Sequence, residues 1–504
     1  MGLLPQWTEK ADKRGLDPLG IQNSGVLLYQ ALLPGISNVT LRMRYYAYYC
    51  WISEAYARRG ASSDFEAWRS WVRRAEALYA LVAARAGETG VGGVEWANRR
   101  LATGKKTIDF AAAASTDASQ ERYLRQSLGV FGGAYYSQMV EIGLFTQNKH
   151  GIQIATRELG KRAASLFAEA IGTAAEKLLL KKIKDASVSI RELDSLTVIA
   201  PSKIPKKSDE REFYETLLFG GNADPNASDA SRAATLRLIL DTAEAIEELP
   251  GPEDVRWHLF DAPEKPLPAP LEGQRLNWEV YQCQDLVQVA SAALLAWAIS
   301  LMNGHDGGIS FPDLRAEIIT HLEARNDNRF ARSWSDLRLA DGIPKFDFRG
   351  AWGTITGRAG SPGDKAVLAI ELMAALDYRV LHRADLAEGI DHELPRRGSA
   401  HSLRTELAWL RLREDRSVIE LIAEYIMERV VRRHGWVAMQ KLRRQQDYTF
   451  LFETHDGRLV FLKGYQPVAT TPRLKPAIDF LCDIHLLDDD GLTVGGRRVL
   501  ESAT

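Results

Sequence analysis

Apolar residues recur at helical spacing along most of the chain, and strictly alternating stretches are short. Residues 229–249 and 276–303 carry apolar side chains at i, i+3, i+4 and i+7, which predicts two long helices. The second is apolar on most sides toward its end, as expected for a helix inside a bundle. Short alternating runs lie near 144–154 and 449–462. The pattern therefore predicts a mainly α, multi-helical fold with small β-hairpins.

The most aromatic of the predicted helices covers residues 40–60, TLRMRYYAYYCWISEAYARRG. We expect Asn38 or Thr40 to cap its start. A stripe typical of a core recurs at i, i+4, i+7 and i+11, namely Tyr45, Tyr49, Ile52 and Tyr56. Arg42 and Arg44 fall on other faces. A helix with aromatic side chains on several faces is largely buried or lines a cavity.

Two segments, residues 139–162 and 481–498, repeat one order of features. Each has a helix, a short apolar strand, a turn with glycine, and a threonine followed by a glycine–basic pair. In the first segment the hairpin joins 144–145 to 152–154. A further hairpin at 449–462 follows a short basic helix. The order of helix, hairpin and helix is that of winged-helix-like units, of which we predict two.

Prolines and lysines suggest where domains meet. The segment PSKIPKKSD at 201–209 is rich in both, as linkers often are. We predict a helical pocket region at 1–200 that ends in a winged-helix-like unit, a central helical domain at 201–400, and a C-terminal winged-helix-like, DNA-contacting domain at 401–504. Six prolines between 250 and 270 predict an extended surface segment there.

Composition and charge exclude several classes of function. The 504 residues carry a net charge of −2, so nucleic-acid binding would depend on local patches. Three scattered cysteines lie in no pair with metal-ligand spacing, which predicts no metal site and a reducing, cytoplasmic location. The N-terminus lacks the apolar core of a signal peptide. We expect no membrane span and no cofactor.

The first candidate site lies in residues 15–51, where aromatic rings, amides, two arginines and one carboxylate are concentrated. The predicted catalytic residue is Asp17, and the predicted substrate-binding residues are Asn38, Arg42, Arg44, Tyr45 and Tyr48. Such residues suit a pocket that stacks on a flipped base and reads its edge. The alternative is a helical core of tyrosines with both arginines in surface salt bridges.

The second candidate site is the basic run RRHGWVAMQKLRR at 432–444. Its cations, with two from the next helix start, are predicted to contact DNA phosphates: Arg432, Arg433, Lys441, Arg443, Arg444, Arg473 and Lys475. The alternative is a solvated helix face that pairs with the acidic segment 414–428.

Other patterns carry less information. The segment 323–334, EARNDNRFARSW, alternates in charge, which is typical of a self-neutralised surface although a metal or phosphate site is possible. The glycine-rich turn GETGVGG at 87–93 has neither GK[ST] nor GxGxxG and predicts no phosphate loop. Neither a GxSxG elbow nor HExxH occurs.

The strings RGLDPLGIQ, LLPGISNVTLRMRYY, RHGWVAMQKL and PRLKPAIDFLCDIHLL are similar to those of a family of bacterial proteins associated with defence against phage. Within that setting the chain resembles bacterial anti-phage DNA glycosylases, which remove glucosylated hydroxymethylcytosine from phage DNA. The resemblance covers the two ends, about a third of the chain, and transfers no catalytic residue.

From the residues and this resemblance we expect a metal-independent DNA glycosylase that acts on double-stranded phage DNA with modified bases. Asp17 would stabilise the oxocarbenium-like sugar or activate water. One alternative is a non-enzymatic DNA-binding sensor or regulator, and another is an adaptor that binds a protein partner. The oligomeric state does not follow from the sequence.

Overall fold

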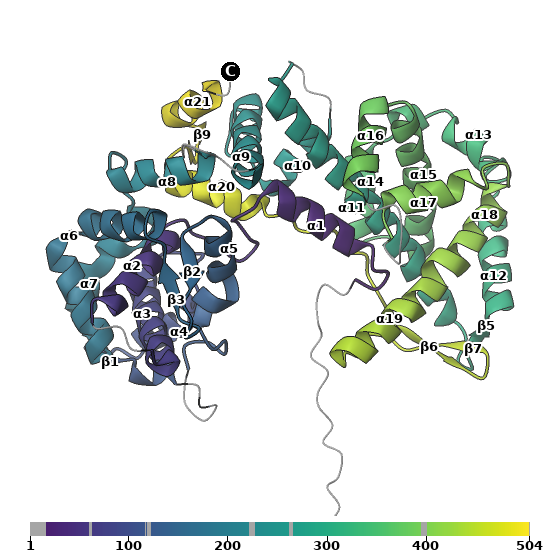
Figure 1. Cartoon of the computed structure of the whole chain (residues 1–504). Coiled ribbons are helices and arrows are strands. Elements are labelled where there is room, and N and C mark those ends of the chain that lie inside the picture. Colours follow the sequence, from purple (N-terminus) through teal and green to yellow (C-terminus); the bar gives the residue numbers. More distant parts are fainter. Residues whose placement is uncertain are drawn as a thin grey trace, which may run out of the picture. The chain divides into compact units, whose positions relative to one another are not determined.

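The computed structural model describes residues 17–59, 63–115, 117, 122–220, 227–261, 266–394 and 401–502. As predicted, the fold is mainly α-helical, and the strands in the described ranges form small antiparallel sheets (Figure 1). The chain divides into two compact units. Unit 1 comprises Met1–Leu28 and Leu276–Thr470, and unit 2 comprises Tyr29–Arg275 and Thr471–Thr504. These boundaries differ from the predicted ones near 200 and 400.

Unit 2 is built from helices with three strand pairs. Its helices are α2 (Tyr45–Ala57), α3 (Phe65–Arg85), α4 (Val94–Ala102), α5 (Tyr136–Glu141), α6 (Leu159–Asp185), α7 (Ile190–Leu196), α8 (Asp209–Phe219), α9 (Ala227–Ile246), α10 (Pro252–Phe260), α20 (Leu474–Asp483) and α21 (Val494–Glu501). The pairs are β1 (Thr107–Asp109) with β4 (Ser187–Ser189), β2 (Phe145–Gln147) with β3 (Gln153–Ala155), and β8 (Leu487–Asp488) with β9 (Gly491–Leu492).

Helix α2 forms the centre of unit 2, where it contacts α3 and α6 (Figure 1). Every residue from Tyr45 to Ser53 is buried, so the predicted core stripe is confirmed. The Tyr79 ring of α3 lies 4.7 Å from Tyr45 and 4.4 Å from Tyr48, measured between centroids. Offset and tilted rings at such distances stabilise a core beyond the area they bury.

The two repeated sequence segments fold alike, as α5–β2–β3–α6 and α20–β8–β9–α21. The residue two positions before each first strand has a positive φ, 81° at Gly143 and 61° at His485. The threonine after each hairpin accepts a backbone N–H at the start of the next helix. Gly160 donates to the Thr156 hydroxyl at 2.9 Å, and Gly496 donates to that of Thr493 at 3.0 Å. The repeat is therefore a shared local structure.

A Gly496→Ala variant is expected to lower the free energy of unfolding by about 1–3 kcal/mol, because the added Cβ would clash with the backbone of Leu486. That Cβ would lie 2.2 Å from the backbone oxygen of Leu486. Chemical denaturation measures the loss. Gly495→Ala is the matched control, since its nearest neighbours are 3.6 Å away. Equal stabilities of the two variants would contradict the prediction.

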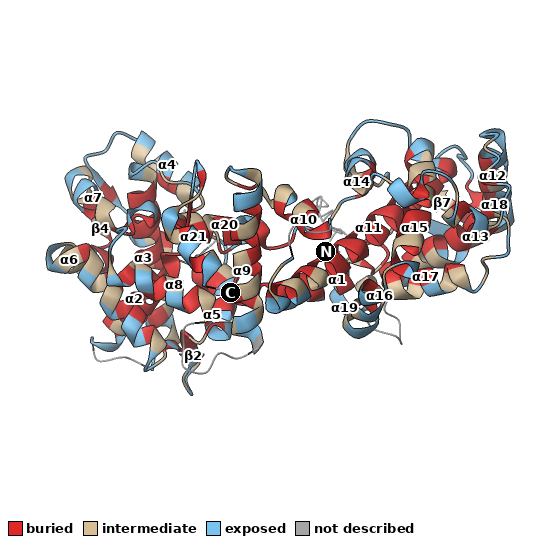
Figure 2. Cartoon of the chain, turned by 90° about the horizontal axis from the view of Figure 1, so that it is seen from above, coloured by how far each residue is buried: buried red, intermediate tan, exposed pale blue. Residues whose placement is uncertain are grey.

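Unit 1 contains most of the remaining helices. These are α12 (Phe311–Ala324), α13 (Trp334–Arg338), α14 (Phe348–Thr356), α15 (Pro362–Leu381), α16 (Ala384–Glu393), α17 (Leu403–Arg411), α18 (Val418–Tyr425) and α19 (Arg432–Gln445). Helices α1 (Gln22–Leu32) and α11 (Ala269–Met302) have residues in both units. Buried residues run along α11 and α15 (Figure 2).

Helix α11 is long and apolar enough to cross a membrane by length and composition. However, 94% of its most apolar window is buried inside the protein. Burial of this kind is typical of the core helix of a water-soluble bundle. The predicted bundle helix at 276–303 is thus present and begins earlier, at Ala269.

A three-stranded antiparallel sheet in unit 1 has the order β5–β7–β6, formed by β5 (Ile309–Ser310), β7 (Arg458–Phe461) and β6 (Phe452–His455). The hairpin of β6 and β7 confirms the one predicted at 449–462. It follows a helical run through α18, a π-helical turn at Ile426–Val431, and α19.

One prediction about the proline-rich segment was wrong. Residues Pro252–Phe260 form helix α10, where an extended segment was expected. Pro252 occupies the first turn, in which a proline needs no backbone N–H and its φ already suits a helix. The Asp254 carboxylate accepts the Gly251 N–H at 3.0 Å and caps the start.

Candidate functional site

Asp17, the predicted catalytic residue, lies in unit 1 before helix α1. Its Oδ1 accepts the backbone N–H groups of Gly20 at 2.7 Å and Ile21 at 3.2 Å. Its backbone oxygen accepts Lys441 Nζ at 2.6 Å. The five predicted substrate-binding residues belong to unit 2. The carboxylate therefore has a structural role at a helix start, and its catalytic role stays a prediction.

Asn38 and Arg42 lie in the loop before α2. Asn38 donates to the Thr471 backbone oxygen at 2.6 Å, so it does not cap α2, which begins at Tyr45. The Arg42 guanidinium pairs with Asp483 and with Glu88, each at 2.8 Å. Burial raises the pKa of Asp483 to about 6 even though Arg42 lowers it. Arg42 thus joins three distant parts of unit 2.

Arg44 and Tyr48 are fully buried. Arg44 makes a two-point contact with Glu210, with Nε at 3.0 Å and Nη2 at 2.9 Å from its oxygens. The Tyr48 hydroxyl donates to the Ala75 backbone oxygen at 2.7 Å. Both arginines are ion-paired, as the alternative proposed, but Arg44 lies in the interior and Arg42 is half-buried. Substrate binding by these residues stays a prediction that their contacts do not support.

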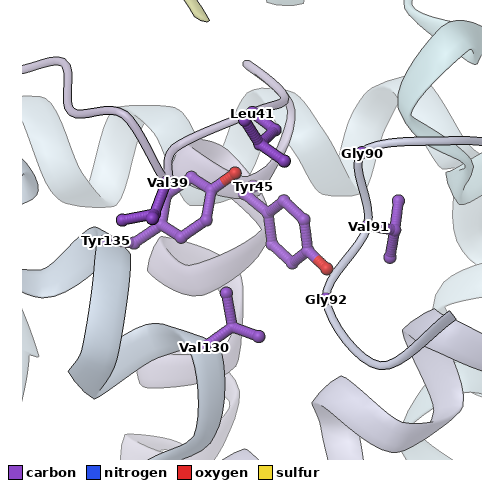
Figure 3. A pocket seen from close by; sticks show the side chains of 8 residues that line it. All are labelled: Val39, Leu41, Tyr45, Gly90, Val91, Gly92, Val130 and Tyr135. Carbon is purple, nitrogen blue, oxygen red and sulfur yellow. The ribbon is translucent and has the colours of Figure 1, made fainter. Parts of the chain in front are cut away.

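Tyr45, a predicted substrate-binding residue, borders a cavity. The cavity measures about 270 Å³ and is bordered by Val39, Leu41, Tyr45, Gly90, Val91, Gly92, Val130 and Tyr135 (Figure 3). Tyr45 is 0% exposed, and among the residues that the structure describes its hydroxyl has no hydrogen-bond partner. Val39, at 54% exposed, stands at the rim. Burial of a hydroxyl without a hydrogen bond is unfavourable, so this position costs free energy of folding.

Glu76 of α3, beside this cavity, was not predicted from the sequence. It is fully buried and accepts the Tyr49 hydroxyl at 2.7 Å. The backbone N–H groups of Phe131 and Val130 also donate to it, at 2.6 and 3.1 Å. Burial raises its pKa to about 7, although these hydrogen bonds oppose the shift. Helix α3 carries two glutamates and several arginines, so its sequence gives no signal that Glu76 in particular is buried.

The basic run of unit 1 is divided between buried and exposed cations. Lys441 is half-buried against the backbone of Asp17, and Arg433 Nε donates to the Leu19 backbone oxygen at 2.8 Å. Burial lowers the pKa of Arg433 to about 10. These two side chains hold the chain before α1 against α19, so their contacts are structural.

The solvent-facing side of α19 carries a stripe at i, i+4, i+7 and i+11, namely Arg432, Trp436, Met439 and Arg443. Trp436 is 44% exposed and Met439 is 45% exposed. The guanidinium of Arg433 lies 4.4 Å from the Trp436 ring centroid. Arg443 and Arg444 are exposed, and within the described residues neither makes an ion pair. We call Arg432, Trp436, Met439, Arg443 and Arg444 the α19 surface.

The acidic segment 414–428 does not neutralise this surface. Three of its four glutamates pair with other arginines instead: Glu414 with Arg338, Glu420 with Arg315, and Glu424 with Arg413 and Arg416. The two predicted DNA contacts at the start of α20 belong to unit 2. There Arg473 is buried and donates to the Leu33 backbone oxygen at 3.0 Å, while Lys475 pairs with Asp479.

The charged segment 323–334 is self-neutralised, as expected. Arg329 pairs with Asp327 and Glu371, each at 2.7 Å, and Arg325 pairs with Asp364 at 2.6 Å. Across the part of the chain that the structure describes, no group of three or more His, Cys, Asp or Glu side chains is placed to hold a metal ion.

Comparison with known proteins adds no relative from which a function could be transferred. The chain matches no protein-family model, no curated protein and no solved structure.

Proposed function

We propose that the chain is a DNA-binding protein, a sensor or regulator, that contacts the DNA backbone through the α19 surface. The observation that carries this proposal is a row of exposed arginines beside an exposed tryptophan on one helix face, where the described part of the chain offers these arginines no carboxylate partner. Arginines of this kind neutralise phosphates, and an aromatic ring between them stacks on a base or packs against a sugar.

The surrounding topology supports the same proposal. In a winged-helix unit, the strand before the second helix pairs with the second strand of the wing hairpin. Unit 1 shares this strand pairing, since β5 precedes α12 and pairs with β7 after α19, although helices α13 to α18 lie between α12 and α19. Exposed Lys463 follows the hairpin directly and adds a cation there. Helix α19 would then take the place of the recognition helix, with the hairpin beside it as the wing.

Base excision receives less support from the contacts than DNA binding does. Asp17 accepts backbone N–H groups in the turn before α1, and Arg42 and Arg44 are ion-paired with carboxylates of the protein. The Tyr45 cavity is lined mainly by apolar side chains, whereas a flipped base is read through polar groups on its edge. Mass spectrometry of modified phage DNA after incubation with the protein tests for released bases. Their appearance would establish base excision in place of simple binding.

An Arg443→Ala/Arg444→Ala variant is expected to bind duplex DNA at least about 10-fold more weakly than the wild type. Fluorescence anisotropy over a range of salt concentrations measures the affinity. The slope of log K against log salt should fall by about 2, because two phosphate contacts are lost.

Arg416→Ala is the matched control for this experiment. Arg416 is an exposed arginine of the same unit, but it is paired with Glu424. Its variant should bind DNA as the wild type does. A wild-type affinity that does not change with salt, or equal losses in both variants, would refute the proposed surface. In that case an adaptor role toward a protein partner is the hypothesis that remains.

A further inference from the structure

Unit 2 also contains a larger, solvent-accessible cavity. It is bordered by the last residues of α3, the end of α4 with the loop that follows, and the start of α7. Helix α3 contacts both α4 and α7, and β1 pairs with β4, so regular secondary structure surrounds the space. Its volume is about 840 Å³, within the range of small-molecule sites. We call it the α3–α7 cleft.

The described lining of the α3–α7 cleft has four cations and no carboxylate. The cations are Arg85, Lys105, Lys106 and Arg191, and each is exposed to solvent. Arg85 pairs with Asp194 at 2.6 Å. Among the residues that the structure describes, the other three cations form no ion pair. Like charges that converge repel one another, so an anion between them is bound favourably.

The backbone brings the two lysines next to Arg191. Strands β1 and β4 pair in antiparallel register, and the Ile190 N–H donates to the Lys106 backbone oxygen at 3.1 Å. Lys105 and Lys106 therefore run alongside the start of α7, which carries Arg191. Thr107 follows them and is also exposed. Its hydroxyl adds a donor of the kind that oxyanions accept.

The charge of the cleft favours a phosphorylated ligand, and its short extent favours a small one. Guanidinium and ammonium groups both bind phosphate, and four of them match the charge of two or more phosphate groups. The positive region is bounded, since exposed Asp109 lies two residues beyond Thr107 on the same face of β1, and Asp194 lies beside Arg85. A nucleic acid that extended past the cleft would meet these carboxylates.

We propose that the α3–α7 cleft binds a small molecule that carries two or more phosphate groups. The four cations neutralise the phosphates, and Leu101 and Ile190 border the space with apolar side chains that suit a less polar part of the ligand. The cleft belongs to unit 2 and the α19 surface to unit 1, so this site goes beyond the proposed DNA contact.

Isothermal titration calorimetry of the full chain with AMP, ADP and inorganic pyrophosphate tests the site. EDTA is present, so that the side chains alone meet the phosphates. The wild type should bind ADP at least about 10-fold more tightly than AMP, because a second phosphate adds charge-assisted hydrogen bonds. Equal affinities for ADP and pyrophosphate would assign recognition to the phosphates alone. Tighter binding of ADP would add a contact with the nucleoside, and either result supports the proposal.

A Lys105→Ala/Lys106→Ala variant should bind ADP at least about 10-fold more weakly than the wild type. Lys206→Ala/Lys207→Ala is the matched control, since these adjacent lysines are also exposed in unit 2 but do not line the cleft. The control should bind ADP as the wild type does. Arg191→Ala, on a different element, provides a second test and should also weaken ADP binding.

Three results would overturn the proposal. The first is a wild type that binds neither ADP nor pyrophosphate. The second is an equal loss of ADP affinity in the two double-lysine variants, which would show unspecific attraction to positive charge. The third concerns duplex DNA, which Lys105→Ala/Lys106→Ala should bind as the wild type does. A loss as large as that of Arg443→Ala/Arg444→Ala would assign the cleft to the nucleic acid instead.

Discussion

An Arg44→Met variant is expected to unfold with a free energy about 3–5 kcal/mol lower than that of the wild type. Arg44 and Glu210 are both almost completely buried, with side chains 0% and 1% exposed. The guanidinium also donates to the backbone oxygens of Val198 at 2.6 Å and Ala200 at 3.0 Å. Without it, the Glu210 carboxylate would remain in the interior without its cation, although the Tyr214 hydroxyl would still donate to it at 3.0 Å. Urea denaturation measures the loss.

Two further variants separate this cause from simple loss of packing. Arg44→Met/Glu210→Met removes both charges at similar volume and should recover at least half of the lost stability. Arg85→Met breaks an exposed pair with Asp194 in the same unit and should leave the unfolding midpoint unchanged. A single Arg44→Met variant as stable as the wild type would show that the pair does not hold unit 2 together.

Local patterns explain why the elements could be predicted from the sequence. The helices at 229–249 and 276–303 appear as α9 and α11, and the hairpin at 449–462 appears as β6 and β7. Helical periodicity and turn residues act over a few positions, so one sequence suffices to detect them. The error at Pro252 has the same local origin, because proline signals either a break or a first helical turn.

The partners of the predicted site residues could not be found in this way. Asp483 is 441 positions from Arg42, and Glu210 is 166 positions from Arg44. No periodicity connects such pairs, so both arginines seemed available for a ligand. The division into two units could not be predicted for the same reason, since unit 2 combines residues 29–275 with the distant residues 471–504.

The basic run at 432–444 and the Tyr45 cavity could be predicted only in part from the sequence. The basic run was identified from its composition, but the division between Arg433, held against Leu19, and exposed Arg443 depends on packing. The Tyr45 cavity needs the glycines at 90 and 92 and Val130 as well. The density of glycine at 87–93 was the signal, and it indicated a close backbone approach instead of a phosphate loop.

A Glu76→Gln variant is expected to lose much of the wild type's dependence of stability on pH between 4.5 and 8. Burial raises the pKa of Glu76 from 4.5 to about 7 in the folded protein. The folded state therefore binds the proton more tightly than the unfolded chain does. Stability from this group is fully present below pH 4.5 and is lost as the pH rises through 7. The shift corresponds to about 3 kcal/mol.

Urea denaturation of both proteins at several pH values measures this difference. The Oε1 of a glutamine can still accept the Phe131 N–H and the Tyr49 hydroxyl. Its amide nitrogen cannot accept the Val130 N–H, and this hydrogen bond is lost equally at every pH. A general loss of stability is therefore distinguishable from a change of slope. Asp483, whose pKa burial raises to about 6, leaves a smaller fall in both proteins. Glu66→Gln, at an exposed carboxylate of the same helix, should keep the wild-type slope. If Glu76→Gln also kept that slope, the carboxyl group would not hold its proton in the folded protein near neutral pH.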